Sequence, residues 1–127
     1  MIRTLFALAF GHLAPAHEVD HARLLAAIRQ VEGHKWSDPG GAYAITPGVW
    51  RDRTRLPYRF AGDPDHAAHV AGLHLTWLAD QLRADGYRVH AYTLAACWSL
   101  GYEGFRRRRG VVDYAVRVEN IYLASAP

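Results

Sequence analysis

The longest regular pattern in this sequence is an apolar stripe at helical spacing between Asp63 and Gly86. Asp63 is a favourable N-cap residue, and a proline directly after it suits the first helical position, where the missing amide hydrogen is not needed. Gly86 supplies a stop signal. The stripe consists of Val70, Leu73, Trp77, Leu78 and Leu82. The pattern predicts one long helix and favours an all-α fold built around it.

Three shorter segments also carry helical apolar patterns. Residues 18–32 form the first and end at Gly33, while residues 92–100 form another, in which small side chains allow close packing at the centre of the fold. A last amphipathic helix contains Tyr114 and ends near Leu123. The sequence therefore predicts four helices.

The segment between the first two predicted helices differs from them in its content of proline and glycine. Residues 34–62 contain Asp-Pro-Gly-Gly, Pro-Gly and a further proline, and this density of helix and strand breakers excludes long regular elements. We expect a long loop with short turns or a small β-ribbon, rich in tryptophan and tyrosine.

The length and composition are typical of a single globular domain. It has 127 residues, of which 50% are hydrophobic and 21% are charged, so a single core is expected and disorder is not. The one cysteine, Cys97, lies in an apolar run and reads as a small buried side chain. A net charge of +3 permits a polyanionic partner without requiring one.

The N-terminus has the features of an export signal. Arg3 precedes an apolar stretch, and Ala14-Pro15-Ala16 has the small-x-small form of a cleavage site, which predicts a signal peptide over residues 1–16 and a mature domain over residues 17–127. A short buried N-terminal helix is the alternative. No other segment approaches the roughly 20 apolar residues of a transmembrane anchor. The expected location is periplasmic or extracellular.

Glu32 is the main candidate for a catalytic residue. It follows Ile28 by one turn and Leu25 by two, so the spacing places it on the apolar face of the first helix, in the last turn. Desolvation and the negative end of the helix dipole should both raise its pKa, as a general acid requires. The alternative is an outward side chain paired with Lys35 or His34.

Four segments in order resemble a known family. Residues 27–32 end in Glu32, residues 41–47 read Gly-Ala-Tyr-Ala-Ile-Thr-Pro, residues 94–101 read Leu-Ala-Ala-Cys-Trp-Ser-Leu-Gly, and residues 114–122 begin and end in tyrosine with Arg-Val between. Together they resemble the lysozyme-like superfamily, closest to the soluble lytic transglycosylase domain. The chain departs from that pattern at Gly33, Ala44 and Ser99, where the family has Ser, Gln and Asn. These departures remove polar groups that would orient a sugar.

The resemblance implies a lysozyme-like helical domain that cleaves bacterial peptidoglycan without a cofactor or a metal. Glu32 would protonate the glycosidic oxygen between N-acetylmuramic acid and N-acetylglucosamine, and no second carboxylate is needed if the sugar's own C6 hydroxyl then attacks. Asp38 and Asp52 do not stand where the family has a nucleophile. Flat side chains with polar edges suit sugar rings, and a main-chain carbonyl could accept an acetamido N–H. The expected substrate contacts are Tyr43, the carbonyl of Ile45, Trp98, Tyr102 and Tyr122, although Trp98 also fits a core position.

Two other functions remain open. A non-catalytic lysozyme-like module that only binds glycan is compatible with the three departures. His17-Glu18-Val19-Asp20-His21 is an H-E-x-x-H pattern, which in a zinc metallopeptidase places two imidazoles on one helical face. The arginines at 106–109 suit a solvated surface or contact with an anionic polymer, but they lack the interleaved aromatics of a nucleic-acid site, so no nucleic-acid partner is expected. We expect a monomer.

Overall fold

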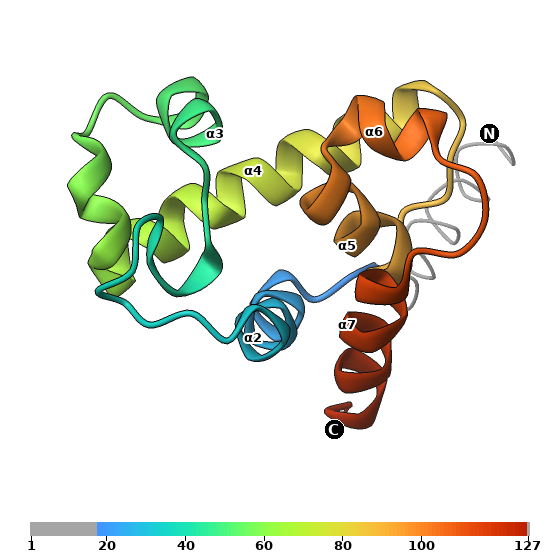
Figure 1. Cartoon of the computed structure of the whole chain (residues 1–127). Helices are drawn as coiled ribbons and strands as arrows, with labels where there is room; N and C mark the ends of the chain where they lie inside the picture. The colour runs from blue at the N-terminus through green and yellow to red at the C-terminus, as the bar shows by residue number, and fades with distance from the viewer. Residues whose placement is uncertain (1–17, 127) are drawn as a thin grey trace, which may run out of the picture.

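A computed structural model describes residues 18–126, and within this range the chain is mainly helical and contains no strand (Figure 1). This result confirms the all-α prediction. The predicted signal peptide and His17 lie outside the described residues. The elements are α2 (His21–Glu32), η2 (Gly41–Tyr43), α3 (Pro47–Arg53), η3 (Tyr58–Gly62), α4 (Pro64–Ala84), α5 (Ala91–Leu100), α6 (Tyr102–Arg107) and α7 (Asp113–Ala124), where η denotes a 3-10 helix. No helix between residues 18 and 126 combines the length and apolar character needed to cross a membrane.

The capping residues set the ends of α4 and α2. The Asp63 side chain accepts a hydrogen bond from the backbone N–H of Asp65, with Pro64 as the first helical residue, as the sequence predicts. α2 starts at His21 and not at residue 18, because the Asp20 side chain accepts from the backbone N–H of Arg23 and fixes the first turn there. Gly33 ends α2 in the left-handed region, with φ 68°.

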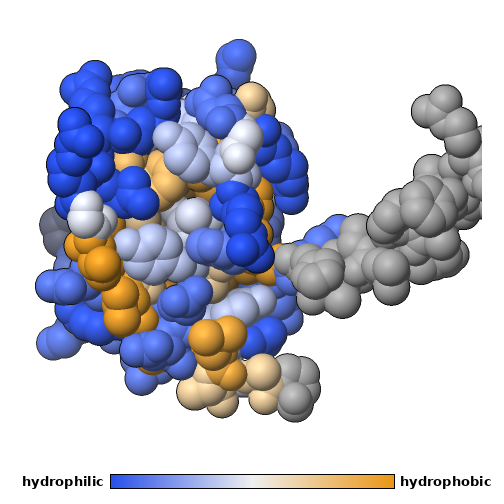
Figure 2. All heavy atoms as spheres, turned by 90° about the vertical axis from the view of Figure 1, so that its right-hand side faces the viewer, coloured by the Kyte–Doolittle hydropathy of each residue, from blue (hydrophilic) through white to orange (hydrophobic). Residues whose placement is uncertain are grey.

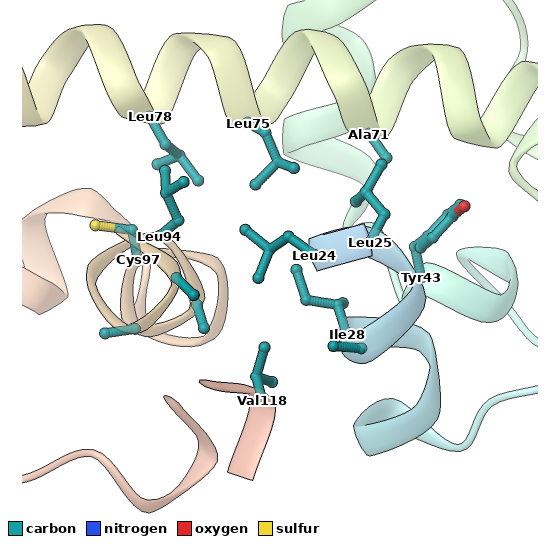
Figure 3. Close-up of a cluster of buried hydrophobic side chains, with 14 of the residues drawn as sticks. Leu24, Leu25, Ile28, Tyr43, Ala71, Leu75, Leu78, Leu94, Cys97 and Val118 are labelled. Carbon is teal, nitrogen blue, oxygen red and sulfur yellow. The ribbon is translucent and has the colours of Figure 1, made fainter. Parts of the chain in front are cut away.

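The core lies where α4 crosses over α2 and α5 (Figure 3). The lower face of α4 presents Leu75 and Leu78, which are fully buried against Leu24 of α2 and Leu94 of α5. The small residues predicted to permit close packing are fully buried on α5, which packs extensively against α7. α7 also packs against α2, so it joins two of the helices that surround α4.

The expected loop over residues 34–62 contains more structure than the sequence analysis predicts. It forms α3 and two 3-10 helices, with no β-ribbon. The Thr46 hydroxyl accepts from the backbone N–H of Val49, and Pro47 begins the helix, so α3 has the same kind of start as α4. Gly41 has φ 69°, and a Cβ there would lie 1.8 Å from the carbonyl oxygen of Ala61. Only glycine permits this approach of η2 to η3.

α6 is the second correction. None of the four predicted helices covers the residues after Gly101, but Gly101 both ends α5 and begins a six-residue helix. Tyr102 and Phe105 are buried three residues apart, which places them on one face of that helix.

Figure 2 views the molecule from the side that is on the right in Figure 1. That side is mainly hydrophilic, with separate small apolar patches.

Candidate functional site

Glu32 and Tyr114 form a polar pair between α2 and α7. Glu32 is the last residue of α2 and is half-buried, and Tyr114 is the second residue of α7. The Tyr114 hydroxyl donates a hydrogen bond to Oε2 of Glu32 over 2.8 Å. Burial raises the pKa of Tyr114, and the Glu32 carboxylate raises it further by hydrogen bonding and by its charge. The phenol therefore stays protonated and remains a donor to the carboxylate.

The other oxygen of the Glu32 carboxyl group has a different environment. Within residues 18–126, no hydrogen bond reaches Oε1, and no ion pair joins Glu32 to Lys35 or His34. Both of these basic side chains belong to exposed residues. The arrangement is a partly desolvated carboxyl group with one oxygen held by a donor and one oxygen uncommitted, which is a chemically usable geometry for proton transfer.

Tyr43 lies in the core beside a more exposed aromatic ring. It is buried in η2, and its ring is nearly perpendicular to that of Trp36, with 5.6 Å between the centroids. The Arg29 guanidinium lies over Trp36 at 5.2 Å. Burial raises the pKa of Tyr43, and the charge of Arg29 partly offsets this. Tyr43 thus supports Trp36, which is half-buried and is the more accessible of the two rings.

The carbonyl of Ile45 is already used inside the protein. The Tyr58 hydroxyl donates to this oxygen, and the Ile45 side chain is buried. A carbonyl oxygen can accept a second hydrogen bond, but here its first partner belongs to η3. This bond ties η3 to the segment that follows η2.

Trp98 contacts a buried histidine. Its half-buried ring meets the His74 ring edge-on, with centroids 5.4 Å apart. Nε of Arg53 donates to Nδ1 of His74 over 3.3 Å. Burial, reinforced by the charge of Arg53 and partly offset by that of Asp52, lowers the pKa of His74 to about 4. His74 is therefore neutral at neutral pH, and Trp98 packs on a structural contact between α3 and α4.

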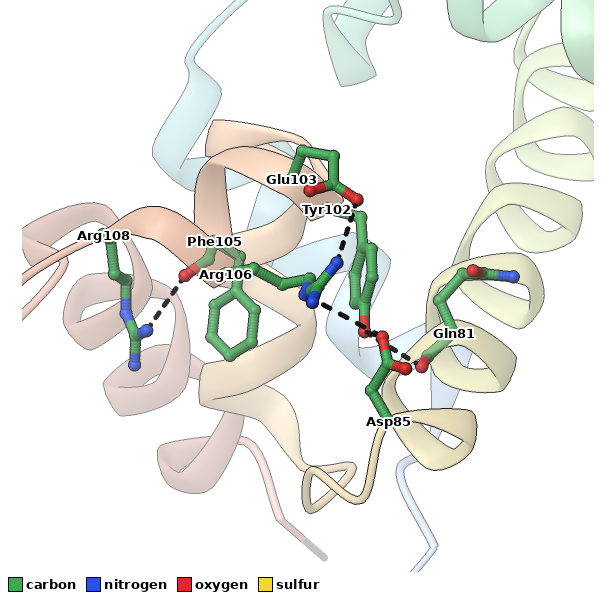
Figure 4. A network of polar contacts seen from close by, with 7 residues as sticks. All are labelled: Gln81, Asp85, Tyr102, Glu103, Phe105, Arg106 and Arg108. Carbon is green, nitrogen blue, oxygen red and sulfur yellow. Dashed lines mark hydrogen bonds and ion pairs between the residues drawn. The ribbon is translucent and has the colours of Figure 1, made fainter.

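Tyr102 joins α6 to the end of α4 (Figure 4). Its hydroxyl donates to the carbonyl oxygen of Gln81 over 3.1 Å and to the Asp85 carboxylate. Burial and the neighbouring Asp85 raise its pKa to about 12. Arg106 pairs with Asp85 at 4.0 Å and with Glu103 at 3.3 Å. These contacts make Tyr102 a structural link.

Tyr122 lies at the far end of α2 from Glu32. Its hydroxyl accepts the backbone N–H of Asp20 over 2.9 Å, just before α2 begins, and the Arg23 guanidinium lies 4.0 Å from its ring centroid. A helix of 12 residues such as α2 is about 18 Å long. Tyr122 is therefore well separated from the carboxyl group that it was expected to assist.

The predicted site residues do not contact one another directly. In the described part of the chain, no hydrogen bond or ring contact joins any two of Glu32, Tyr43, Ile45, Trp98, Tyr102 and Tyr122. The partner that sequence analysis missed is Tyr114. Its signal was available, because Tyr114 is the first residue of the closing segment in the family resemblance.

Two hollows flank the segment around the end of α2. One, of about 400 Å³, is lined by Ala26, Arg29, Gln30 and His34 on the outer side of the helix. The larger one, of about 590 Å³, lies between the loop containing Trp36 and the segment around η3. The Glu32 side chain itself lines neither hollow.

The H-E-x-x-H pattern is not laid out along one helix. Residues 18–20 are not helical, and α2 begins only at His21. Two zinc-binding imidazoles four residues apart need a continuous helix between them to share one face. Among residues 18–126, no group of three or more His, Cys, Asp or Glu side chains is arranged to hold a metal ion.

The chain was compared with family models, curated proteins and solved structures, and none of them matches it.

Proposed function

We propose that the protein is an exported glycosidase that cleaves bacterial cell-wall glycan, with Glu32 as its general acid. The observation that carries the proposal is the half-buried carboxyl group of Glu32, with Tyr114 on one oxygen and the other oxygen uncommitted. The order of motifs in the sequence, which resembles the lysozyme-like superfamily, supplies the substrate class. The bond cleaved would join N-acetylmuramic acid to N-acetylglucosamine.

The reaction needs only one protein carboxyl group. Oε1 of Glu32 gives its proton to the glycosidic oxygen as the bond from that oxygen to C1 breaks, which leaves an oxocarbenium-like centre and a carboxylate. The carboxylate then accepts the proton of the C6 hydroxyl as that oxygen bonds to C1. The product is a 1,6-anhydro sugar, and Glu32 is protonated again. Attack by water in place of the C6 hydroxyl would give hydrolysis.

Asp38 and Asp52 have other contacts in the fold. Asp38 accepts the backbone N–H of Lys35 over 2.8 Å and so shapes the loop after α2. Asp52 lies on α3, where its charge acts on His74. The single-acid mechanism needs neither of them, because the C6 hydroxyl of the sugar replaces a protein nucleophile.

Mass spectrometry of the products tests the proposal. Purified wall glycan incubated with the wild-type chain should release fragments that carry an anhydro end, or fragments heavier by one water if hydrolysis occurs. Glu32→Gln should release neither. Glu103→Gln is a matched control, since it makes the same change on an exposed residue of α6. Equal release by wild type and Glu32→Gln would refute the proposed role of Glu32.

A non-catalytic glycan-binding module is the second candidate. The observation in its favour is the identity of three residues, since Gly33, Ala44 and Ser99 supply no amide side chain to orient a sugar. Ala44 is even held in the left-handed region, with φ 54°, as the cap of η2. If wild type and Glu32→Gln both sediment with wall material and neither releases product, this second candidate replaces the first.

A further inference from the structure

A hollow of about 440 Å³ lies beside the end of α3. This volume is within the usual range of small-ligand pockets. Arg51 and Arg55 line the hollow together with apolar and aromatic side chains, and none of the described residues that line it is acidic. The mechanism proposed above uses none of its residues. The charge of the lining favours an anionic ligand.

The bend after α3 brings Arg51 and Arg55 to the same hollow. Arg51 lies in the last turn of α3, and Arg55 follows the cap residue Thr54. The backbone N–H of Thr54 donates to the carbonyl of Trp50 over 3.0 Å. Nε1 of the buried Trp50 ring donates to the carbonyl of Leu56 over 2.8 Å, which holds the segment after the helix against its last turn. The backbone that carries the two arginines is therefore fixed by the fold and does not need a ligand to form.

The fold leaves both of these guanidinium groups uncommitted. Arg51 and Arg55 are exposed, and between residues 18 and 126 neither side chain forms an ion pair, a hydrogen bond or a cation–π contact. The two charged residues between them act elsewhere, since Arg53 donates to Nδ1 of His74 and the charge of Asp52 acts on the same ring. The hollow thus keeps two positive charges that no described carboxylate pairs with.

Two guanidinium groups at one hollow fit a phosphate better than a carboxylate. Each guanidinium presents its N–H donors in a planar fork, and one such fork is enough for the two oxygens of a carboxylate. A phosphate monoester has three terminal oxygens and carries nearly two negative charges at neutral pH. The Thr54 hydroxyl adds a donor, because its oxygen accepts from the backbone N–H of Leu56 and its hydrogen can bind a further acceptor. The donors and charges of the lining therefore match a phosphate monoester.

The rest of the lining indicates that the ligand also has an apolar part. Phosphate has five heavy atoms, so at about 30 Å³ for each, as for a water molecule, it would fill about a third of the hollow. Pro47 and Leu56 line the hollow and are exposed, with 36% of Leu56 open to solvent. An apolar group on the phosphate would remove these side chains from water, which is favourable.

We propose that this hollow binds a phosphate monoester whose organic group has an apolar face, with the phosphate beside Arg51 and Arg55 and the organic group on Pro47 and Leu56. The site does not depend on the function proposed for Glu32, because none of its residues takes part in that mechanism. The phosphate belongs either to a soluble ester or to the headgroup of a lipid such as phosphatidic acid, and both present the same terminal group. The site would select a doubly charged phosphate over a singly charged anion of the same shape.

Titrations of the wild-type chain, followed by the NMR chemical shifts of its backbone amides, test the proposal. The probes are phenyl phosphate, its singly charged analogue phenyl sulfate, and inorganic phosphate. At about pH 7.5 phenyl phosphate is mostly doubly charged, because the second pKa of a phosphate ester lies near 6. We expect phenyl phosphate to bind about three- to fivefold tighter than phenyl sulfate, as one further exposed charge pair allows, with the largest shifts between residues 47 and 58. Equal affinity for the two probes, or shifts concentrated elsewhere, would overturn the proposal.

Variants of the lining separate the contributions of charge and apolar contact. Arg51→Gln and Arg55→Gln should each weaken phenyl phosphate about three- to fivefold, whereas Arg88→Gln, at an exposed residue outside the hollow, should leave its affinity unchanged. Leu56→Ala should weaken phenyl phosphate but not inorganic phosphate. Amide shifts outside residues 47–58 that match those of the wild type verify that each variant is folded. A preference for phosphate over sulfate that persists in both arginine variants would contradict the assigned site.

Vesicles and an oligonucleotide distinguish the sources of the phosphate. Sedimentation with phosphatidylcholine vesicles that contain phosphatidic acid, and its loss in Arg51→Gln, would assign the lipid headgroup. Binding of phenyl phosphate without sedimentation would assign a soluble ester. Sedimentation that is equal with phosphatidylserine and survives Arg51→Gln would exclude the lipid headgroup as the source. Tighter binding of a single-stranded oligonucleotide than of phenyl phosphate would replace the monoester with a phosphodiester polymer.

Discussion

The two ends of the α2–α7 pair make an informative comparison, because a tyrosine of α7 reaches α2 at each end. The helices run antiparallel, with Tyr122 beside the start of α2 and Tyr114 beside its last residue. At the first end, the Tyr122 hydroxyl accepts the Asp20 backbone N–H, and its carbonyl accepts Nη2 of Arg23 over 2.6 Å. At the second end, the Tyr114 hydroxyl donates to a carboxylate.

The difference shows what each end is suited to do. The polar groups at the Tyr122 end form hydrogen bonds with a backbone N–H and with a guanidinium, as is usual for contacts that stabilise a fold. The Tyr114 end holds a partly desolvated carboxyl group whose second oxygen has no partner within the described chain. Desolvating a carboxylate costs stability, so such a group contributes little to folding. We therefore expect the Tyr122 end to contribute to stability, and under the function proposed above the Tyr114 end would carry the chemistry.

Glu32→Gln should have the largest effect on this comparison. The amide oxygen can still accept from Tyr114, so the fold should survive, but the side chain can no longer transfer a proton. We expect the rate of glycan cleavage to fall about 10²–10⁴-fold, the usual contribution of general acid catalysis. Initial rates of product release, with Glu103→Gln as the control, measure it. A variant that kept more than a tenth of the wild-type rate would remove the distinction between the two ends.

Arg23→Ala is the corresponding change at the opposite end. It deletes the hydrogen bond to the Tyr122 carbonyl, the guanidinium over the Tyr122 ring and a bond from Nε to the Ser125 hydroxyl. We expect the free energy of unfolding to fall by about 1–3 kcal/mol. Urea denaturation measures this loss, and the cleavage rate per folded molecule should not change. A loss of cleavage in the fully folded variant would show that this end also serves the reaction.

The sequence predicted the main helices because their signals are local. Apolar residues at helical spacing define α2, α4 and α7, an apolar run defines α5, and capping residues add to the signals of α2 and α4. α3 and α6 were missed although their signals were present: Thr46-Pro47 repeats the start pattern of Asp63-Pro64, and Tyr102 and Phe105 have helical spacing. The formation of a short helix depends on its packing against neighbouring elements. The local periodicity of the sequence does not contain this information.

The candidate site was harder to predict because a residue type does not specify the surroundings of its side chain. Tyr122 follows the fully buried Val118 by four residues, and Tyr114 precedes it by four, so helical periodicity puts all three on one face of α7. That face packs on α2. The partners of each tyrosine depend on which part of α2 it meets, and this is set by the tertiary arrangement. The pairing of Glu32 with Tyr114 could therefore not be derived from spacing alone.

Alkaline titration sharpens the comparison through the raised pKa of Tyr114. In the unfolded chain, tyrosine ionises near pH 10, whereas folded Tyr114 keeps its proton to higher pH. Above pH 10 the unfolded state binds fewer protons, so the free energy of unfolding should fall by about 1.4 kcal/mol per pH unit for this group. Tyr114→Phe should make the decline shallower, as urea denaturation at successive pH values would show. Tyr102 would still contribute, because its pKa is also raised, to about 12. An unchanged slope in the variant would contradict the burial of the Tyr114 phenol.

The smallest expected effect comes from removing one hydroxyl at each end. Tyr114→Phe deletes only the donor to Oε2 of Glu32, and we expect cleavage to slow about two- to tenfold, the equivalent of one modest hydrogen bond. Tyr122→Phe makes the same deletion beside Asp20 and should lower the free energy of unfolding by about 1 kcal/mol, with no change in the cleavage rate per folded molecule. Initial rates of product release and urea denaturation measure the two effects. Equal cleavage rates for the two folded variants would show that the Tyr114 hydroxyl does not assist the reaction, and that its hydrogen bond to Glu32 does not distinguish this end of α2 from the other.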